Sequence, residues 1–195
     1  MKLVVLDVET GGLDPQKDSL LSVGAVVWED GVLGKTIHFL VKEDTINAGA
    51  EALSINGLTV EQVENEGVSP VTAVAMLRQW LLDAGFQVSP GKVTMGGHNV
   101  AFDAGFIERL FRLANARNPF AYRRICTQSA ALFLMAAGRA NYNNTGLDAL
   151  CRTHGIEIRA MGSLGKHNAL EDAVATAKLL TKFTEMVQPI IPMAG

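Results

Sequence analysis

Four acidic residues lie where the surrounding apolar pattern predicts a buried side chain. Asp7 and Glu9 interrupt an apolar run that begins at Leu3, and one residue separates them. In a strand, this i, i+2 spacing points both carboxylates to the same side. Two like charges on one face of a central strand repel each other and lose hydration. The pair therefore predicts a positively charged group beside it.

Asp103 lies in the first turn of a helix predicted over residues 101–116. An acid at that place interacts favourably with the helix dipole, which is one explanation for it. Four apolar residues follow at the spacing of one helix face: Phe106, Ile107, Leu110 and Ala114. Because Asp103 shares this core-facing stripe, the periodicity predicts that its carboxylate points inward.

The last predicted helix, over residues 169–187, begins with two adjacent acids. Glu171 falls on the polar face, with Asn168 as the expected helix cap, so a structural role is predicted for it. Asp172 instead falls on the apolar face, which it shares with Ala175, Leu179 and Phe183. Its carboxylate is therefore predicted to point at the core, as those of Asp7, Glu9 and Asp103 are.

Buried carboxylates are commonly explained either by basic partners or by metal ions. Inward-facing Lys or Arg candidates are scarce in the segments that hold these four acids. Hard divalent cations with oxygen ligands fit better, and four carboxylates supply enough charge for two Mg²⁺ or Mn²⁺ ions. Zinc fits less well because the sequence holds no cluster of Cys and His. The pattern favours a divalent metal site over salt bridges.

His167 lies five residues before Asp172. The segment SLGK precedes it, and a glycine-containing loop would let the side chain move toward the carboxylates. A lone histidine is more commonly a surface or cap residue. Beside a metal cluster, however, its ordinary pKa of about 6.5 suits a general base that takes a proton from water.

The elements that must position these residues change in type along the chain. Three strands with short links come first and predict an antiparallel meander. Helices and strands then alternate, which favours an α/β fold with a mixed five-stranded sheet flanked by helices. The predicted strands begin at residue 3 and cover 20–28, 32–41, 93–99 and 123–127. The predicted helices cover 69–85, 101–116, 128–137, 147–155 and 169–187, with Ser69 and Asn99 as caps, whereas 42–69 reads as polar and irregular.

The composition is ordinary for an α/β protein, with 48% apolar and 19% charged residues. A length of 195 residues suits one domain spanning residues 1–195. No apolar run approaches the roughly 18 residues that cross a membrane, and the N-terminus has no signal-peptide pattern. Cys126 and Cys151 have no metal-type spacing and are expected to be reduced, which fits a cytoplasmic protein.

The net charge of −3 does not indicate a nucleic-acid binder, but the charges are unevenly distributed. Residues 43–66 hold six acids and no base, whereas residues 109–147 hold six arginines and no acid. These arginines are Arg109, Arg112, Arg117, Arg123, Arg124 and Arg139. They either decorate a solvated surface or form a surface for a polyanion.

Three segments resemble the motifs of the DEDDh exonuclease family. They are DVETGGLDP (7–15), GHNVAFDAGFI (97–107) and HNALEDA (167–173), and each falls on the expected strand or helix. This RNase H-like group includes the proofreading subunit of bacterial DNA polymerase III, RNase T and oligoribonuclease. The resemblance implies an RNase H-like fold and 3′→5′ removal of nucleoside 5′-monophosphates from the 3′ end of single-stranded DNA or RNA.

The resemblance also assigns roles to the five residues singled out above. Asp7, Glu9, Asp103 and Asp172 would bind two divalent metal ions, and His167 would be the general base. Asp7 would contact both ions, with Glu9 and Asp172 completing one site and Asp103 helping the other. Such a site catalyses an in-line displacement at phosphorus.

Substrate contacts follow from the same resemblance. Thr10, Gly11 and Leu13 would receive the terminal nucleotide through backbone contacts and apolar bulk. Phe102 and Phe106 could stack on bases, although ordinary core packing is the alternative for Phe106. Asn56 stands where the family often has His, and Cys126 stands where Asp is frequent.

Two other function classes stay open from the sequence. One is a non-catalytic nucleic-acid-binding module on the same fold, which the retention of all five site residues argues against. The other is a subunit that acts through protein contacts, such as a proofreading or accessory subunit of a DNA polymerase. A homodimer is a further possibility by analogy with small relatives. No motif reports whether DNA or RNA is preferred.

Overall fold

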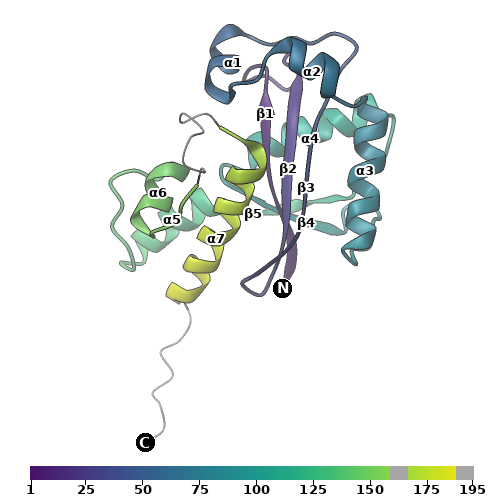
Figure 1. The fold of residues 1–195 in the computed structure, drawn as a ribbon. Helices are drawn as coiled ribbons and strands as arrows, with labels where there is room; N and C mark the ends of the chain where they lie inside the picture. The colour runs from purple at the N-terminus through teal and green to yellow at the C-terminus, as the bar shows by residue number, and fades with distance from the viewer. Residues whose placement is uncertain (159–166, 188–195) are drawn as a thin grey trace, which may run out of the picture.

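The computed structural model describes residues 1–158 and 167–187, which form one sheet flanked by helices (Figure 1). The strands are β1 (Lys2–Thr10), β2 (Leu20–Glu29), β3 (Val32–Leu40), β4 (Val93–Gly97) and β5 (Phe120–Cys126). Their order in the sheet is β3-β2-β1-β4-β5. β1–β2 and β2–β3 are antiparallel, whereas β1–β4 and β4–β5 are parallel. This confirms the predicted mixed five-stranded sheet with an antiparallel meander first.

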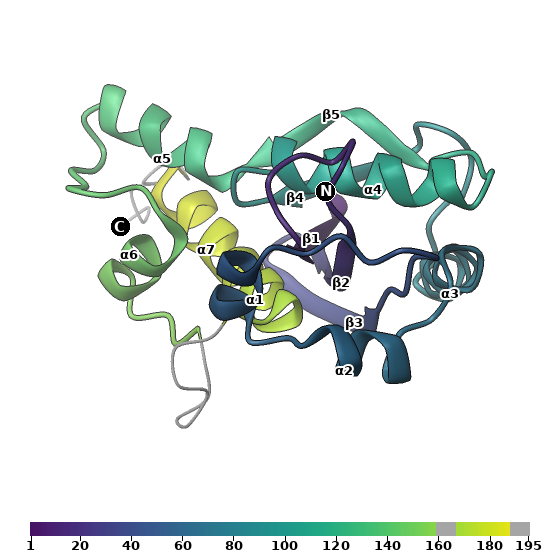
Figure 2. The same cartoon turned by 90° about the horizontal axis from the view of Figure 1, so that it is seen from above.

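Helices cover both faces of the sheet (Figure 2). They are α1 (Ala50–Asn56), α2 (Val60–Glu66), α3 (Pro70–Asp83), α4 (Ala101–Leu113), α5 (Thr127–Ala136), α6 (Leu147–Thr153) and α7 (Ala169–Val187). α3 and α4 pack on one face, α7 packs on the other, and α5 and α6 pack beside α7. None of the helices in the described ranges is long and apolar enough to span a membrane.

β1 is the central strand, and its alternation divides the core in two. Val4, Leu6 and Val8 point to the face covered by α3 and α4. Leu3 and Val5 point to the opposite face, where they pack with apolar residues of α7. All five side chains are at most 6% exposed. A strand buried on both faces explains the nearly continuous apolar run at its start.

The caps predicted for two helices are present. The Ser69 hydroxyl accepts a 3.2 Å bond from the Thr72 amide at the start of α3, and Pro70 occupies the first turn. The Asn168 side chain accepts from the amides of Leu170 and Glu171 at 3.0 and 3.2 Å at the start of α7. These bonds satisfy amides that have no partner within the helix.

Two expectations about local structure are wrong. The segment 42–69 is not irregular throughout, because it contains α1 and α2; each buries only one residue, Asn56 or Val63, so neither shows an apolar face in the sequence. Asn99 does not cap α4, since it has a left-handed backbone with φ of 57° and Val100 occupies the cap position. Asn99 instead accepts the Phe102 amide through its backbone carbonyl at 3.0 Å.

α7 begins unusually close to β2, at a glycine. Gly24 pairs in register with Asp7 of β1, and a Cβ on it would lie 2.2 Å from the backbone nitrogen of Leu170. Only a residue without a side chain permits this approach. The start of α7, which carries Asp172, is thereby brought against the central strand.

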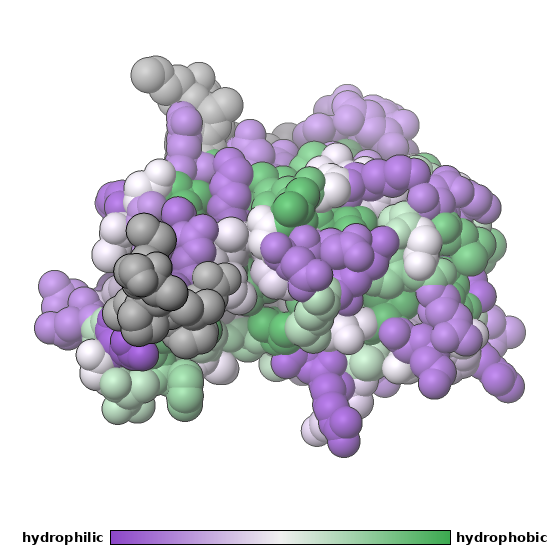
Figure 3. Space-filling model, turned by 90° about the horizontal axis from the view of Figure 1, so that it is seen from below, coloured by the Kyte–Doolittle hydropathy of each residue, from purple (hydrophilic) through white to green (hydrophobic). Residues whose placement is uncertain are grey.

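The surface at the amino end of β1 is mixed in polarity. Hydrophilic residues cover much of it, with hydrophobic groups between them (Figure 3). Singly exposed apolar side chains are common on soluble domains and need no functional explanation.

Candidate active site

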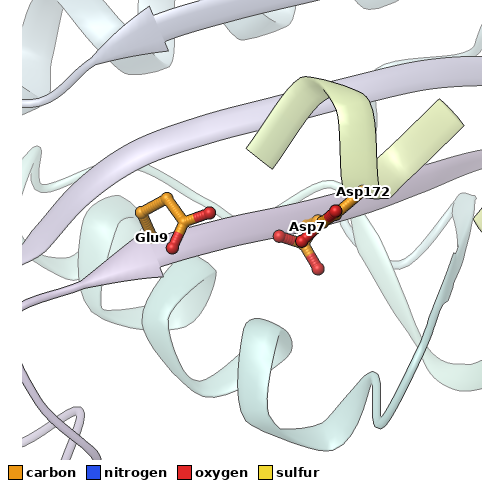
Figure 4. A group of neighbouring side chains, drawn as sticks. All are labelled: Asp7, Glu9 and Asp172. Atoms are coloured by element: carbon orange, nitrogen blue, oxygen red, sulfur yellow. The ribbon is translucent and has the colours of Figure 1, made fainter. Parts of the chain in front are cut away.

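Asp7, Glu9 and Asp172 come together at the carboxyl half of β1. The two strand acids continue the row of Leu3 and Val5, so they point toward α7, whose first turn carries Asp172 (Figure 4). One ligand atom from each of the three residues lies within 4.8 Å of the others. The i, i+2 spacing on the strand and the apolar face of the last helix predicted this meeting.

Asp103 approaches the same strand from α4. Its side chain is 3% exposed, and its Oδ1 accepts a 3.1 Å bond from the amide of Val8, the residue between Asp7 and Glu9. Burial raises the pKa of Asp103 to about 7, although the bonds from its own amide and from that of Val8 act in the opposite direction. The inward orientation predicted for Asp103 from the apolar face of its helix is thus confirmed.

The pKa of Asp7 is raised well above its ordinary value. Burial is the largest cause, followed by the negative charges of Asp103, Asp172 and Glu9. A divalent cation would remove both costs, because carboxylate oxygens are the ligands that hard cations prefer. The donor set therefore fits Mg²⁺ or Mn²⁺, and Asp7, Glu9 and Asp172 are the residues that could hold such an ion together.

His167 lies at the edge of this acidic group. Its Nδ1 is 2.9 Å from Oδ2 of Asp172, and its backbone amide donates to the Ile55 carbonyl of α1 at 3.2 Å. The imidazole is 42% exposed, whereas Asp172 is 3% exposed. The histidine therefore contacts a buried acid on one side and solvent on the other. The segment SLGK before it lies wholly outside the described residues, and so does the freedom to move that was predicted from it.

A cleft of about 540 Å³ opens beside Glu9, and we call it the main cleft. Five of the predicted substrate residues line it: Thr10, Gly11, Leu13, Asn56 and Phe102. Its lining is shaped by hydrogen bonds, since Thr10 donates through Oγ1 to the Gly12 carbonyl at 2.7 Å. Asn56 donates to the Thr10 carbonyl at 3.3 Å and accepts from the Leu58 amide at 2.9 Å. Leu13 is 84% exposed at the rim.

The opposite wall of the main cleft comes from residues that the sequence did not single out. They are Asn47, Ala48, Gly49, Glu51, Ala52 and Ile55, from α1 and the loop before it. Gly11 fits closely against this wall, because a Cβ on it would lie 2.1 Å from the Asn47 carbonyl oxygen. Ile55 is 53% exposed, so an apolar side chain faces the opening. These residues carry no motif, and only their position after the third strand could have suggested them.

Phe106 does not reach the cleft, so the prediction that it stacks on a base is wrong. Its side chain is fully buried in the core between β1 and α4. Its ring packs on that of Phe102, with centroids 5.1 Å apart. Of the two aromatic residues, only Phe102 offers a partly exposed ring to the main cleft.

The prediction that Arg109 belongs to a surface group of arginines is also wrong. Its guanidinium is paired with Glu43, and their side chains are 14% and 5% exposed. Arg123 and Arg124 of β5 are exposed, as predicted. The Arg124 guanidinium carbon lies 5.7 Å from the centroid of Tyr122, a ring that is 90% exposed.

A family model described as "Exonuclease" matches residues 4–180. The chain belongs to this exonuclease family. Ribonuclease T of Citrobacter koseri is 32% identical over 195 residues, which cover 94% of this chain and 83% of the relative. The 3'-5' DNA exonuclease Cap18 of Escherichia coli is 29% identical over 177 residues, which cover 90% of this chain and 88% of that protein. The predicted resemblance to the DEDDh exonucleases is confirmed.

Longer proteins match over a part of their length. DNA polymerase III PolC-type of Thermotoga petrophila is 29% identical over 187 residues, which cover 96% of this chain and 12% of the polymerase. The solved structure of E. coli exonuclease I in complex with a dT13 oligonucleotide aligns with a TM-score of 0.74 and 20% identity. That alignment covers 93% of this chain and 40% of the exonuclease I chain. It confirms that the exonuclease fold described here is RNase H-like.

Proposed function

We propose that residues 1–195 act as a single, metal-dependent 3′→5′ exonuclease domain that releases nucleoside 5′-monophosphates from single-stranded nucleic acid. The observation that carries this proposal is the meeting of Asp7, Glu9 and Asp172 within 4.8 Å beside the main cleft. The names of the relatives support it, because Ribonuclease T and the 3'-5' DNA exonuclease Cap18 match over most of their lengths.

The acids would hold the metal ions, with Asp7, Glu9 and Asp172 at the centre and Asp103 next to Asp7. Two Mg²⁺ or Mn²⁺ ions bound there would neutralise charge on the scissile phosphate and lower the pKa of a water molecule. The raised pKa of Asp7 supports metal binding, since a cation is what would restore the ionised form of this buried carboxyl.

His167 would be the general base. The 2.9 Å contact between its Nδ1 and Asp172 favours the tautomer with the proton on Nδ1, which leaves Nε2 as the basic nitrogen. Nε2 would take a proton from the attacking water as its oxygen bonds to phosphorus and the bond from phosphorus to the 3′ oxygen breaks, so that the 3′ oxygen leaves with the shortened strand. The partial exposure of the imidazole gives the proton a path to solvent.

The main cleft would bind the terminal nucleotide. Its floor beside Glu9 is formed by Thr10 and Gly11, so a 3′ end placed there lies next to the acids. Leu13, Ile55 and Phe102 supply apolar surface for the last bases, which stack on such surfaces without regard to sequence. A single strand fits better than a duplex, because a terminal nucleotide must be separated from its partner to enter.

The direct test uses the purified chain with end-labelled DNA and RNA oligonucleotides, single-stranded and paired, in Mg²⁺. We expect mononucleotides to appear from a 3′-hydroxyl end and from no other end, and addition of a chelator should stop their release. Comparing release from the DNA and RNA oligonucleotides shows whether deoxyribose or ribose is preferred. Release from the 5′ end, or no release in any arm, would contradict the proposal.

A proofreading or accessory role in a polymerase is a second candidate, and the match to the PolC-type polymerase favours it. Co-purification with a polymerase subunit would support this role. Size-exclusion chromatography of the isolated chain would show whether it forms a homodimer instead. Cys126 and Cys151 are free thiols, which supports the cytoplasmic location proposed for either role.

A further inference from the structure

Arg109 and Glu43 form a largely buried ion pair that lies outside the lining of the main cleft. Arg109 donates from Nε to Oε1 of Glu43 at 3.0 Å and from Nη2 to Oε2 at 2.7 Å. The two side chains are 14% and 5% exposed. Two parallel bonds of this kind hold a guanidinium and a carboxylate in one fixed orientation. The pair joins α4 to the segment that follows β3.

The Glu43 carboxylate is bound by the loop that shapes the cleft as well. It accepts the Ser19 hydroxyl and the Leu20 amide, each at 3.1 Å. The Ser19 hydroxyl in turn accepts the Asn47 amide at 2.9 Å, and the Ser19 backbone carbonyl accepts the Gly11 amide at 2.8 Å. Both Gly11 and Asn47 line the main cleft. A continuous chain of hydrogen bonds therefore runs from Arg109 to the floor of the cleft.

Arg109 holds a second part of the same loop directly. Its Nη1 lies 3.3 Å from the carbonyl oxygens of both Pro15 and Gln16. These residues follow Leu13, whose exposed side chain forms the rim of the main cleft. The other end of α4 carries Phe102 on the cleft wall and Asp103 next to Asp7.

We propose that Arg109 is a positioning residue, which fixes the loop of residues 11–19 against α4 and thereby sets the width of the main cleft. The proposal rests on the function proposed above. Arg109 does not touch the acids, since it lies six residues after Asp103, about 9 Å along the helix. Its loss should therefore change how the substrate binds and leave the metal site unchanged.

Only arginine can make this set of contacts. Its planar fork reaches both Glu43 oxygens and still directs one nitrogen at the two loop carbonyls, whereas a lysine offers a single ammonium. The substitutions Arg109→Met, Arg109→Lys and Glu43→Gln remove successively smaller parts of the network. Glu43→Gln keeps an acceptor for the Leu20 amide, so it tests the ion pair with the least damage to folding.

The test compares KM and kcat of these variants on a single-stranded 3′-hydroxyl oligonucleotide in Mg²⁺. We expect Arg109→Met to raise KM about tenfold, with kcat at saturating substrate changed by less than about twofold. The concentration of Mg²⁺ at half-maximal activity should stay at the wild-type value. Arg109→Lys and Glu43→Gln should give smaller increases in KM. Arg152→Met removes the same charge from an exposed position of α6 and should leave both constants unchanged.

A second measurement separates this proposal from the proposed function. Amide hydrogen exchange at Gly11, Ser19 and Gly49 should be faster in Arg109→Met and Glu43→Gln than in the wild type, because their bonds define the loop. A folded variant with unchanged KM and unchanged exchange would overturn the proposal, and so would a loss confined to kcat. If the wild-type chain releases no mononucleotides, the proposed function fails, and the exchange rates alone then decide the role of Arg109.

Discussion

At the scale of single residues, the carboxylates of the candidate site are buried close to one another, which disfavours their charged forms. Burial raises the pKa of Asp7, and the negative charges of Asp103, Asp172 and Glu9 raise it further. A group of this kind destabilises the folded chain at neutral pH and becomes favourable once a cation binds. If Asp7 binds metal as proposed, stability and function make opposite demands on its side chain.

Asp7→Asn should abolish nuclease activity and, in chelator, raise Tm by about 2–4 °C for each 1 kcal/mol of repulsion removed. The amide keeps the size of the side chain but carries no charge. Thermal unfolding with and without Mg²⁺ measures this, and the stabilisation by Mg²⁺ should shrink in the variant. Asp44→Asn, at an exposed position, is the matched control. Full activity in Asp7→Asn would rule out the metal mechanism.

The pKa of Asp103 predicts a pH dependence of stability in the metal-free chain. The carboxyl has a pKa of about 7 when folded and an ordinary value of 3.8, so the folded state binds its proton more tightly. Its contribution is fully present below about pH 4 and is lost as the pH rises through about 7. Tm in chelator should fall between about pH 4 and pH 7, and the fall should be smaller in Asp103→Asn. An equal fall in both proteins would show that another group titrates.

His167→Ala should lower kcat by about 10²–10⁴-fold, since general-base catalysis contributes an amount of this order. KM should change little, because the imidazole lies beside the acids and outside the lining of the main cleft. Steady-state kinetics with a 3′-hydroxyl oligonucleotide measures both constants. His154→Ala, on a histidine bonded to Tyr142 away from the acids, should retain wild-type kcat. A rise in KM alone would remove His167 from the proton transfer.

At the scale of elements, the site depends on how closely α7 approaches the sheet. Gly24→Ala should destabilise the fold by about 1–3 kcal/mol, because the new methyl group would overlap the backbone of Leu170. The shift of α7 should also move Asp172 and raise the Mg²⁺ concentration needed for activity. Urea unfolding and a Mg²⁺ titration measure the two effects.

The control for this element is Gly34→Ala on the edge strand β3. A Cβ there would lie 3.4 Å from the nearest atom, an ordinary contact. We therefore expect Gly34→Ala to keep wild-type Mg²⁺ dependence. If both variants behave alike, the close approach at Gly24 is not what holds the helix.

The sequence predicted those elements whose apolar period is long or whose strand is buried on both faces. β1, α4 and α7 belong to this class, and their inward acids could be identified because they share a face with apolar residues. α1 and α2 were missed because each buries a single residue, Asn56 or Val63, which is too few to show an apolar face, whereas α6 has the same length but buries Leu150 and Cys151 and was predicted. The far wall of the main cleft, which α1 supplies, was missed for the same reason.

At the scale of the whole molecule, the basic surface is smaller than the sequence indicated. Arg109 is removed from it by Glu43, a residue 66 positions earlier in the chain, and no local pattern could have paired them. Phe106 is a similar case, since a partly exposed and a fully buried phenylalanine on one helix look alike until the helix is docked. Such assignments depend on which segments of the fold become neighbours.

The arginines that stay exposed should still contribute to substrate binding. Charge reversal at Arg123 and Arg124 should weaken binding of a single-stranded oligonucleotide and reduce its dependence on salt, because fewer counterions are released. Tyr122→Ala, which removes the exposed ring under Arg124, should weaken binding with the salt slope unchanged. Binding titrations at several salt concentrations measure both. An unchanged slope after charge reversal would make these arginines a solvated surface.

The two sides of the candidate active site also differ in how firmly they are anchored. The acids of β1 lie on a central strand that is paired on both sides and packed in both cores. α1 has seven residues, of which only Asn56 is buried. Segments with few buried contacts open by local fluctuations, whereas central strands are exposed only by global unfolding. As denaturant is added, the half of the site that would bind the nucleotide should therefore unfold before the half that would bind metal.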